Sequence, residues 1–134
     1  MGFYGNYFTE SAHKLSLSNF KREDIKPKKK DTDVLAQYII KWKDKNKLVA
    51  NVTITQYDNG DNFIHDLDVS KEYRGNGLSY QILDIAVKEF KCNCLFVKAD
   101  NKIAIHIYEK YGFKKTNENY SGKEDGLKGY IMRM

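Results

Sequence analysis

Apolar and polar residues alternate along most of the chain between residues 34 and 69, which is typical of strands with one buried face. The alternation predicts strands over Val34–Trp42, Leu48–Thr55 and Phe63–Val69. Polar turns at Lys43–Lys47 and Asp58–Asn62 separate them. Three consecutive strands with such short connections predict an antiparallel meander.

The spacing of the apolar residues changes at Leu78. From there to Phe90 it is helical, with Leu78, Ile82, Ile85, Ala86, Val87 and Phe90 on the inner side. A short strand, Leu95–Lys98, follows, and we expect it to lie parallel to Phe63–Val69 because a helix connects the two. A second helix is expected to begin at Asp100 or Asn101 as its cap and to end at Gly112.

The two ends of the chain complete the predicted fold. The alternation around Leu15 and Leu17 predicts a short strand within the otherwise irregular first 32 residues. Phe113–Thr116 and Leu127–Met134 predict a final strand pair, joined by a polar loop over 117–126. The order βββ-α-β-α-ββ predicts an α+β fold, a mixed sheet with helices packed against it.

Composition narrows the class of protein. At 134 residues, with 41% apolar residues, the chain is expected to form a single domain, 1–134, and disorder is excluded. It has no apolar run long enough to span a membrane and no signal peptide, so we expect a soluble cytoplasmic protein without membrane contact. Cys92 and Cys94 lack a second cysteine pair, which favours reduced thiols and no metal site.

The net charge of +5 is compatible with a phosphate-bearing ligand and also with weak nucleic-acid contact. The basic run Lys26–Lys30 is the main feature in favour of nucleic acid. No basic stripe interleaved with aromatic residues accompanies it, so a solvated linker is the favoured interpretation and nucleic-acid binding is not expected.

A glycine-rich turn stands between the strand Phe63–Val69 and the helix that begins at Leu78. It reads Tyr73-Arg74-Gly75-Asn76-Gly77. Glycines let successive backbone N–H groups converge, and the N-terminus of a helix adds a positive potential. Strand, turn and helix together predict a cradle for a phosphate or pyrophosphate.

Two common phosphate-binding patterns do not fit this turn. The chain has no Gly-x4-Gly-Lys-Ser/Thr, and a dinucleotide-binding turn would place its third glycine where Tyr80 stands. Instead, Arg74-Gly75-Asn76-Gly77-Leu78-Ser79 resembles the pyrophosphate loop of the GNAT superfamily of N-acetyltransferases, Gln/Arg-x-x-Gly-x-Gly/Ala. Ser79 stands where that family prefers glycine or alanine, and its small side chain preserves a close approach.

A second block supports the same resemblance. Asn101-x-x-Ala104-Ile105-x-x-Tyr108-Glu109-Lys110-x-Gly112-Phe113 is similar to the next motif of the family. The resemblance covers about residues 34–134. It implies a GNAT fold that binds acetyl-CoA, with residues 63–113 as the acetyl-CoA-binding core and 1–33 as a variable N-terminal segment.

The resemblance also implies roles for particular residues. The loop from Arg74 to Ser79 (Arg74, Gly75, Asn76, Gly77, Leu78 and Ser79) would bind the pyrophosphate. Backbone groups of Leu67, Asp68 and Val69 would align the pantetheine and polarise the acetyl carbonyl. Asn101 would contact the pantetheine or cap the second helix. Tyr108 would bind near the thiol sulfur and act as the general acid.

The general base is less constrained by sequence. Asp66 and Asp68 are expected on the strand face that holds Ile64, and His65 on the opposite face with Leu67. We rank Asp66 first and His65 second, since acidic residues within a strand are unfavourable unless they are used. A chain of water molecules without a dedicated base is the third option.

The function expected from these features is N-acetylation of a primary amine, in a small molecule or a peptide, by direct attack on acetyl-CoA. The alternative is a GNAT scaffold that binds an acyl-CoA without turnover or serves as an interaction module. We expect the acceptor pocket to come from residues 1–33, 58–62 and 117–126, and the N-terminal aromatic residues make a homodimer plausible.

Overall fold

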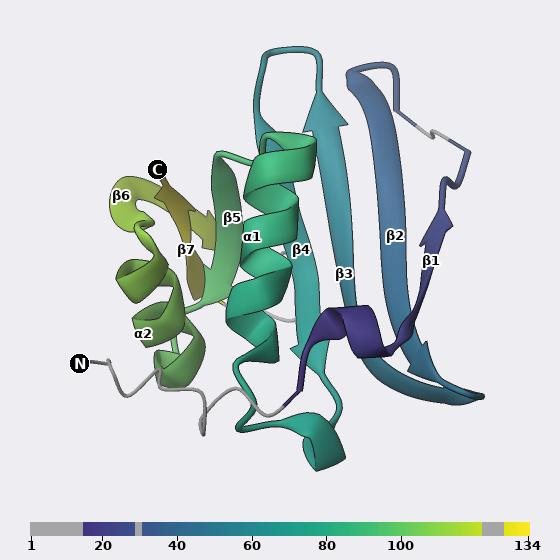
Figure 1. Cartoon of the computed structure of the whole chain (residues 1–134). Coiled ribbons are helices and arrows are strands. Elements are labelled where there is room, and N and C mark those ends of the chain that lie inside the picture. Colours follow the sequence, from purple (N-terminus) through teal and green to yellow (C-terminus); the bar gives the residue numbers. More distant parts are fainter. Residues whose placement is uncertain (1–14, 29–30, 122–127) are drawn as a thin grey trace.

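One mixed sheet organises the molecule (Figure 1). The computed structural model describes residues 15–28, 31–121 and 128–134. Its seven strands lie in the order β1-β2-β3-β4-β5-β7-β6. They are β1 Lys21–Ile25, β2 Val34–Asp44, β3 Lys47–Tyr57, β4 Asn62–Val69, β5 Cys94–Lys98, β6 Lys114–Ser121 and β7 Lys128–Arg133. The helices are α1 Leu78–Phe90 and α2 Lys102–Tyr111, with 3-10 turns η2 Leu17–Asn19 and η3 Lys71–Tyr73.

The predicted meander is confirmed, since β2, β3 and β4 pair antiparallel in sequence order. The hairpin turn between β2 and β3 is tighter than predicted, because the strands continue to Asp44 and from Lys47 and leave two residues between them. Lys45 adopts a φ of 58° there, as a short hairpin turn requires.

Strands β4 and β5 are parallel, as predicted, but they pair over a short stretch. Phe63 lies opposite Cys94 and Ile64 opposite Leu95, and no further pair joins the two described strands. β5 continues against β7 instead, with register from Cys94–Arg133 to Lys98–Gly129. The sheet is therefore split between β4 and β5 towards the carboxyl ends of these strands.

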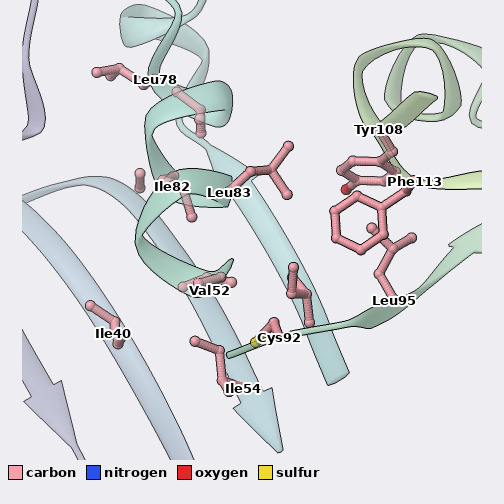
Figure 2. Close-up of a cluster of buried hydrophobic side chains, with 14 of the residues drawn as sticks. Ile40, Val52, Ile54, Leu78, Ile82, Leu83, Cys92, Leu95, Tyr108 and Phe113 are labelled. Carbon is pink, nitrogen blue, oxygen red and sulfur yellow. The ribbon is translucent and has the colours of Figure 1, made fainter. Parts of the chain in front are cut away.

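Both helices pack on one face of the sheet and share one hydrophobic core. The core includes Ile82 and Leu83 from α1 and Tyr108 from α2. Figure 2 shows the α1 side chains against Val52 and Ile54 of β3, with Tyr108 beside Phe113. The Tyr111 hydroxyl donates a 2.7 Å hydrogen bond to Asp84 and so connects the two helices directly.

The N-terminal part of the described chain corrects one prediction. The short strand expected around Leu15 and Leu17 is instead the 3-10 turn η2, which begins with a capping box formed by Ser16 and Asn19. The first strand follows at Lys21–Ile25, and its mostly exposed side chains give no apolar alternation. Gln81 of α1 fixes the segment before β1, because its side-chain amide accepts from Leu17 N at 2.9 Å and donates to Leu15 O at 3.1 Å.

The final strand pair is confirmed, but β6 extends to Ser121, well into the predicted loop. The rest of that loop, residues 122–126, and the first residue of the predicted last strand, Leu127, lie outside the described residues. Cys92 and Cys94 are free thiols, and burial raises the pKa of each to about 12. None of the helices in the described ranges is long and apolar enough to cross a membrane.

Candidate active site

A cavity of about 560 Å³ opens where β4 and β5 separate. It lies between the end of β4, the start of α1 and one side of α2. Of the residues predicted to bind the cofactor, all except Asn76 line it: Leu67, Asp68, Val69, Arg74, Gly75, Gly77, Leu78, Ser79, Asn101 and Tyr108. The parting of the strands thus brings together two sequence blocks that were predicted to act at one site.

The glycine turn has the conformation that an anion cradle needs. Gly75 and Gly77 have φ values of 81° and 76°, in the left-handed region that side chains disfavour. The first backbone bond of α1 runs from Gln81 N to Gly77 O at 3.2 Å. Within the described residues, no acceptor takes a hydrogen bond from the backbone N–H groups of residues 75–79. These groups are therefore available to an anion in the cavity.

Two side chains hold the turn in place. Asn76, which does not line the cavity, donates from Nδ2 to Tyr73 O at 3.1 Å and Arg74 O at 3.2 Å. Arg74 donates from Nε to Val69 O at 2.8 Å, and its guanidinium lies 3.6 Å from an Asp68 carboxylate oxygen. These side chains thus bond the turn to itself and to the end of β4. They do so without using the backbone N–H groups of residues 75–79.

A bulge interrupts β4 at Asp66, whose φ is 49°. His65 lies opposite Thr53 and Asp68 opposite Asn51, so two residues of β4 occupy the space opposite a single residue of β3. Asn51 donates from Nδ2 to the Asp66 carbonyl at 3.1 Å and holds the bulge. A bulge beside a cleft frees backbone groups from strand pairing and re-aims side chains.

This bulge overturns the predicted faces of the strand. Because Asn51 and Thr53 share one face of β3, their partners Asp68 and His65 also share a face. Asp68 is therefore not on the Ile64 face, and Leu67, expected beside His65, packs against the core. The period-two pattern assumed an uninterrupted strand, and the extra residue reverses it.

Tyr108 extends from α2 into the cavity and is 8% exposed. Burial raises the pKa of its hydroxyl to about 12, so it remains protonated at neutral pH. The hydroxyl forms no hydrogen bond with any residue in the described part of the chain. A protonated hydroxyl at a cavity wall, without a protein acceptor, can donate to a bound group.

Asn101 caps α2, as predicted, since its Oδ1 accepts from Ala104 N at 3.2 Å. The same residue lines the cavity. The cap uses the oxygen of the side-chain amide, and the Nδ2 group has no acceptor among the described residues. Its two predicted roles are therefore compatible with each other.

A second cavity of about 380 Å³ lies on the opposite face of the sheet, across β2, β3 and β4. Its lining consists of Asp31, Val34, Gln37, Thr53, Thr55, Tyr57, His65 and Asp66. Sequence analysis identified His65 and Asp66 but missed the residues from β2 and β3. The available signal was weak, because these residues come together only through the strand register.

His65 is the most enclosed titratable group of this second cavity. Its ring stacks on Phe63 with a centroid distance of 5.6 Å and an interplanar angle of 21°. The Nε2 atom is buried, with no hydrogen-bond partner among the described residues. Burial lowers the pKa of His65 below its usual value, although the neighbouring Asp66 opposes the change. The imidazole is therefore neutral at pH 7 and able to accept a proton.

The segments expected to build the acceptor pocket contribute little to the second cavity. Of residues 1–33, 58–62 and 117–126, Asp31 alone is among its lining residues in the described part of the chain. Asp61, in the turn before β4, instead forms an ion pair with Arg133 at 3.0 Å. Glu118 of β6 pairs with the same arginine at 2.8 Å.

Comparison with known proteins agrees with this geometry. Residues 6–113 match the model of the acetyltransferase (GNAT) family. A GNAT family acetyltransferase from Elizabethkingia anophelis, solved with acetyl-CoA bound, superposes with a TM-score of 0.64 at 15% identity, covering 87% of this chain and 97% of that one. No curated protein matches the sequence.

Two further solved structures are also similar. NAA60 of Arabidopsis thaliana, solved with a bisubstrate analogue, has a TM-score of 0.58 at 19% identity, over 73% of this chain and 74% of that one. The ribosomal-protein-S18-alanine N-acetyltransferase of Escherichia coli has a TM-score of 0.56 at 22% identity, over 77% and 69%. At these identities the likeness supports the fold alone.

Proposed function

The chain belongs to the GNAT family of acetyltransferases, which use acetyl-CoA as cosubstrate, and we propose that it acetylates a primary amine of a small molecule or peptide. The observation that carries the proposal is the position of the β4 bulge between two cavities. Asp66 lines the cavity on one side of the sheet, and Leu67 lines the cavity on the other. A donor and an acceptor bound in the two cavities would therefore each lie beside one of two consecutive residues of β4.

We assign the first cavity to acetyl-CoA, with residues 63–113 as the binding core. The free amides of Gly75 to Ser79 fit a pyrophosphate, because an anion replaces water on several N–H donors at once. Arg74 adds a positive charge beside them. The backbone of Leu67–Val69, released from pairing with β5, would bond the pantetheine, and the Nδ2 of Asn101 would donate to it.

The chemistry requires a general base and a general acid. An alkylammonium has a pKa of about 10.4, so it must lose a proton before its nitrogen can attack the acetyl carbonyl. His65 is the better base, because its neutral imidazole lies in the acceptor cavity; Asp66 is the second candidate. The base passes the first ammonium proton to water before the attack. As the new C–N bond forms and the C–S bond breaks, the departing thiolate takes a proton from Tyr108, and the second proton of the nitrogen returns to Tyr108 through water, so that each turnover releases one proton to solvent.

The alternative is a scaffold that binds acyl-CoA without turnover. Thiol release measured with acetyl-CoA and a panel of primary amines separates the two functions. Turnover above the rate of spontaneous hydrolysis is expected, with His65→Gln reducing kcat by about 10²-fold or more and Asp66→Asn reducing it less. Co-purification of a CoA species in native mass spectrometry, without thiol release from any amine, would favour the scaffold.

A further inference from the structure

We propose that Asn51 is a positioning residue for acetyl transfer. By binding the Asp66 carbonyl, it directs the backbone N–H of Leu67 into the first cavity, where that N–H would polarise the acetyl carbonyl. The inference rests on the proposed function and deepens the account of the same site. Asn51 itself lines neither of the two cavities and was not among the residues predicted to act.

The bulge at Asp66 depends on a side chain for one of its hydrogen bonds. The register leaves Val52 alone opposite two residues of β4, and the Asp66 carbonyl accepts from Asn51 Nδ2 at 3.1 Å. The φ of Asp66, 49°, lies in the left-handed region, which is unfavourable for a residue with a Cβ. Strained backbone persists only where neighbouring groups fix it, and it is most frequent at functional sites. Asn51 provides such a fixing contact here.

The direction of the Leu67 N–H follows from the planarity of the peptide group. The described residues contain no cis peptide bond, so the Asp66 carbonyl and the Leu67 N–H lie in one trans plane and point in opposite directions. The carbonyl points towards Asn51 on β3. Because β3 and β5 flank β4 on its two sides, the N–H points away from β3, towards the side of β5.

That side is where the first cavity opens. Leu67 lines the cavity, and no residue of β5 pairs with it in the described strands. Asn51 shares a face of β3 with Thr53, which lines the second cavity. Its side chain therefore draws the Asp66 carbonyl towards the acceptor face and tilts the N–H towards the cofactor face. A donor whose direction is fixed before the reaction stabilises the negative charge that develops on the carbonyl oxygen.

The test measures polarisation of the bound thioester without turnover. Acetyl-CoA labelled at its thioester carbonyl carbon is added to the protein, and the carbonyl stretch is recorded by isotope-edited infrared difference spectroscopy. Polarisation lowers the frequency, so the wild-type protein should shift the band below its position in water. Asn51→Ala should return the band towards that position. Asn51→Asp should return it further, because a carboxylate cannot donate to the Asp66 carbonyl and repels it.

Kinetics and CoA binding separate positioning from a purely structural role. Both Asn51 variants should lower kcat by roughly tenfold to 10²-fold, less than the loss of an oxyanion donor outright. The Kd for CoA, which has no acetyl carbonyl, should not change.

Gln56→Ala is the matched control. Gln56 lies on the same strand, donates from its side-chain amide to one backbone carbonyl, Phe90 O at 3.2 Å, and lines neither cavity. The control variant also loses one hydrogen bond, so its Tm should fall as it does in Asn51→Ala, while kcat and the carbonyl band stay as in the wild type.

The outcomes that overturn the inference are distinct from those that overturn the proposed function. A wild-type band at its position in water, a band unchanged in both Asn51 variants, or a loss of CoA affinity as large as the loss of kcat would refute the positioning role alone. Bound acetyl-CoA with no thiol release to any amine would refute the proposed function, and a band that depends on Asn51 would still support its effect on the Leu67 N–H. Failure to bind acetyl-CoA would refute both.

Discussion

The two cavities on either side of β4 differ in how they would recognise a ligand. The first presents main-chain groups: the free amides of residues 75–79 and the edge of β4 that no longer pairs with β5. The second presents side chains, which come from the turn before β2 and from β2, β3 and β4. A pyrophosphate is the same in every acyl-CoA, so backbone donors suffice for it, whereas an acceptor must be selected by side-chain chemistry.

The two cavities also differ in the charge of the residues that line them. Arg74 and the N-terminus of α1 make the first cavity suitable for an anion. Asp31 and Asp66 make the second suitable for a cation. Because the two lie on opposite faces of the sheet, a polyanionic donor and a cationic acceptor would each be attracted to its own side.

Tyr108 is an exception to the rule that the first cavity presents main-chain groups, because its proposed role depends on a side chain. Tyr108→Phe should lower kcat by about 10²-fold or more, with a small effect on the KM for acetyl-CoA. Steady-state kinetics at saturating amine measures both. Tyr130→Phe, a partly buried tyrosine of the core, is the control and should retain kcat. An unchanged kcat in Tyr108→Phe would show that the ring serves packing alone.

Main-chain recognition on the cofactor side can be isolated by a pair of glycine substitutions. Gly75 and Gly60 have φ values of 81° and 94°, and an added Cβ at either one meets nothing within 4 Å. Gly75→Ala and Gly60→Ala should therefore lower the free energy of unfolding by a similar amount, about 1–2 kcal/mol.

Only Gly75→Ala should also weaken acetyl-CoA binding, by about tenfold, since its Cβ stands in the anion cradle. Calorimetric titration and thermal unfolding of both variants separate the two effects. Equal acetyl-CoA affinity in the two variants would argue against pyrophosphate binding at this turn.

Substitutions of Asn101 are expected to have a smaller effect, and they distinguish helix capping from a contact with the pantetheine. Asn101→Ala removes the cap and should reduce the free energy of unfolding by about 1 kcal/mol. Asn101→Ser retains a capping oxygen but lacks the Nδ2 donor. If that donor binds the pantetheine, both variants raise the KM for acetyl-CoA; if Asn101 is a cap alone, serine restores the wild-type KM.

The smallest effect is expected on the acceptor side, in the pH dependence of stability. The pKa of His65 is lower in the folded than in the unfolded chain, where it is 6.5. Below pH 6.5 the unfolded state therefore binds more protons, and stability decreases as the pH falls towards the folded-state pKa. His65→Gln should flatten this decrease in denaturant titrations, and an unchanged pH dependence would show that His65 does not cause it.

Most residues that line the first cavity were predicted from sequence to lie at one site, for a physical reason. Helical spacing from Leu78 and the adjacent Gly75 and Gly77 encode the strand–turn–helix locally, within a few consecutive residues. A family resemblance then extended the prediction to Asn101 and Tyr108. The cleft that unites them depends on where β4 leaves β5, and no local pattern predicts that point.

The second cavity could not be predicted from the sequence, because the residues that line it are far apart along the chain. The bulge at Asp66 is a single extra residue, and the alternation of apolar positions does not reveal it. Gln37, Thr53 and Thr55 read as the polar face of ordinary strands and meet at one cavity only through the register. β1 was missed because an edge strand with charged side chains has no buried face to show.

The short junction between β4 and β5 has a mechanical consequence. Two residue pairs connect the strands β1–β4 to the strands β5–β7, although α1 also bridges the two halves from one side. Opening or closing the gap by a small rotation would break no strand pairing within either half. The width of the gap in which a long, thin thioester would lie is therefore set by side-chain packing in the shared core and not by strand pairing.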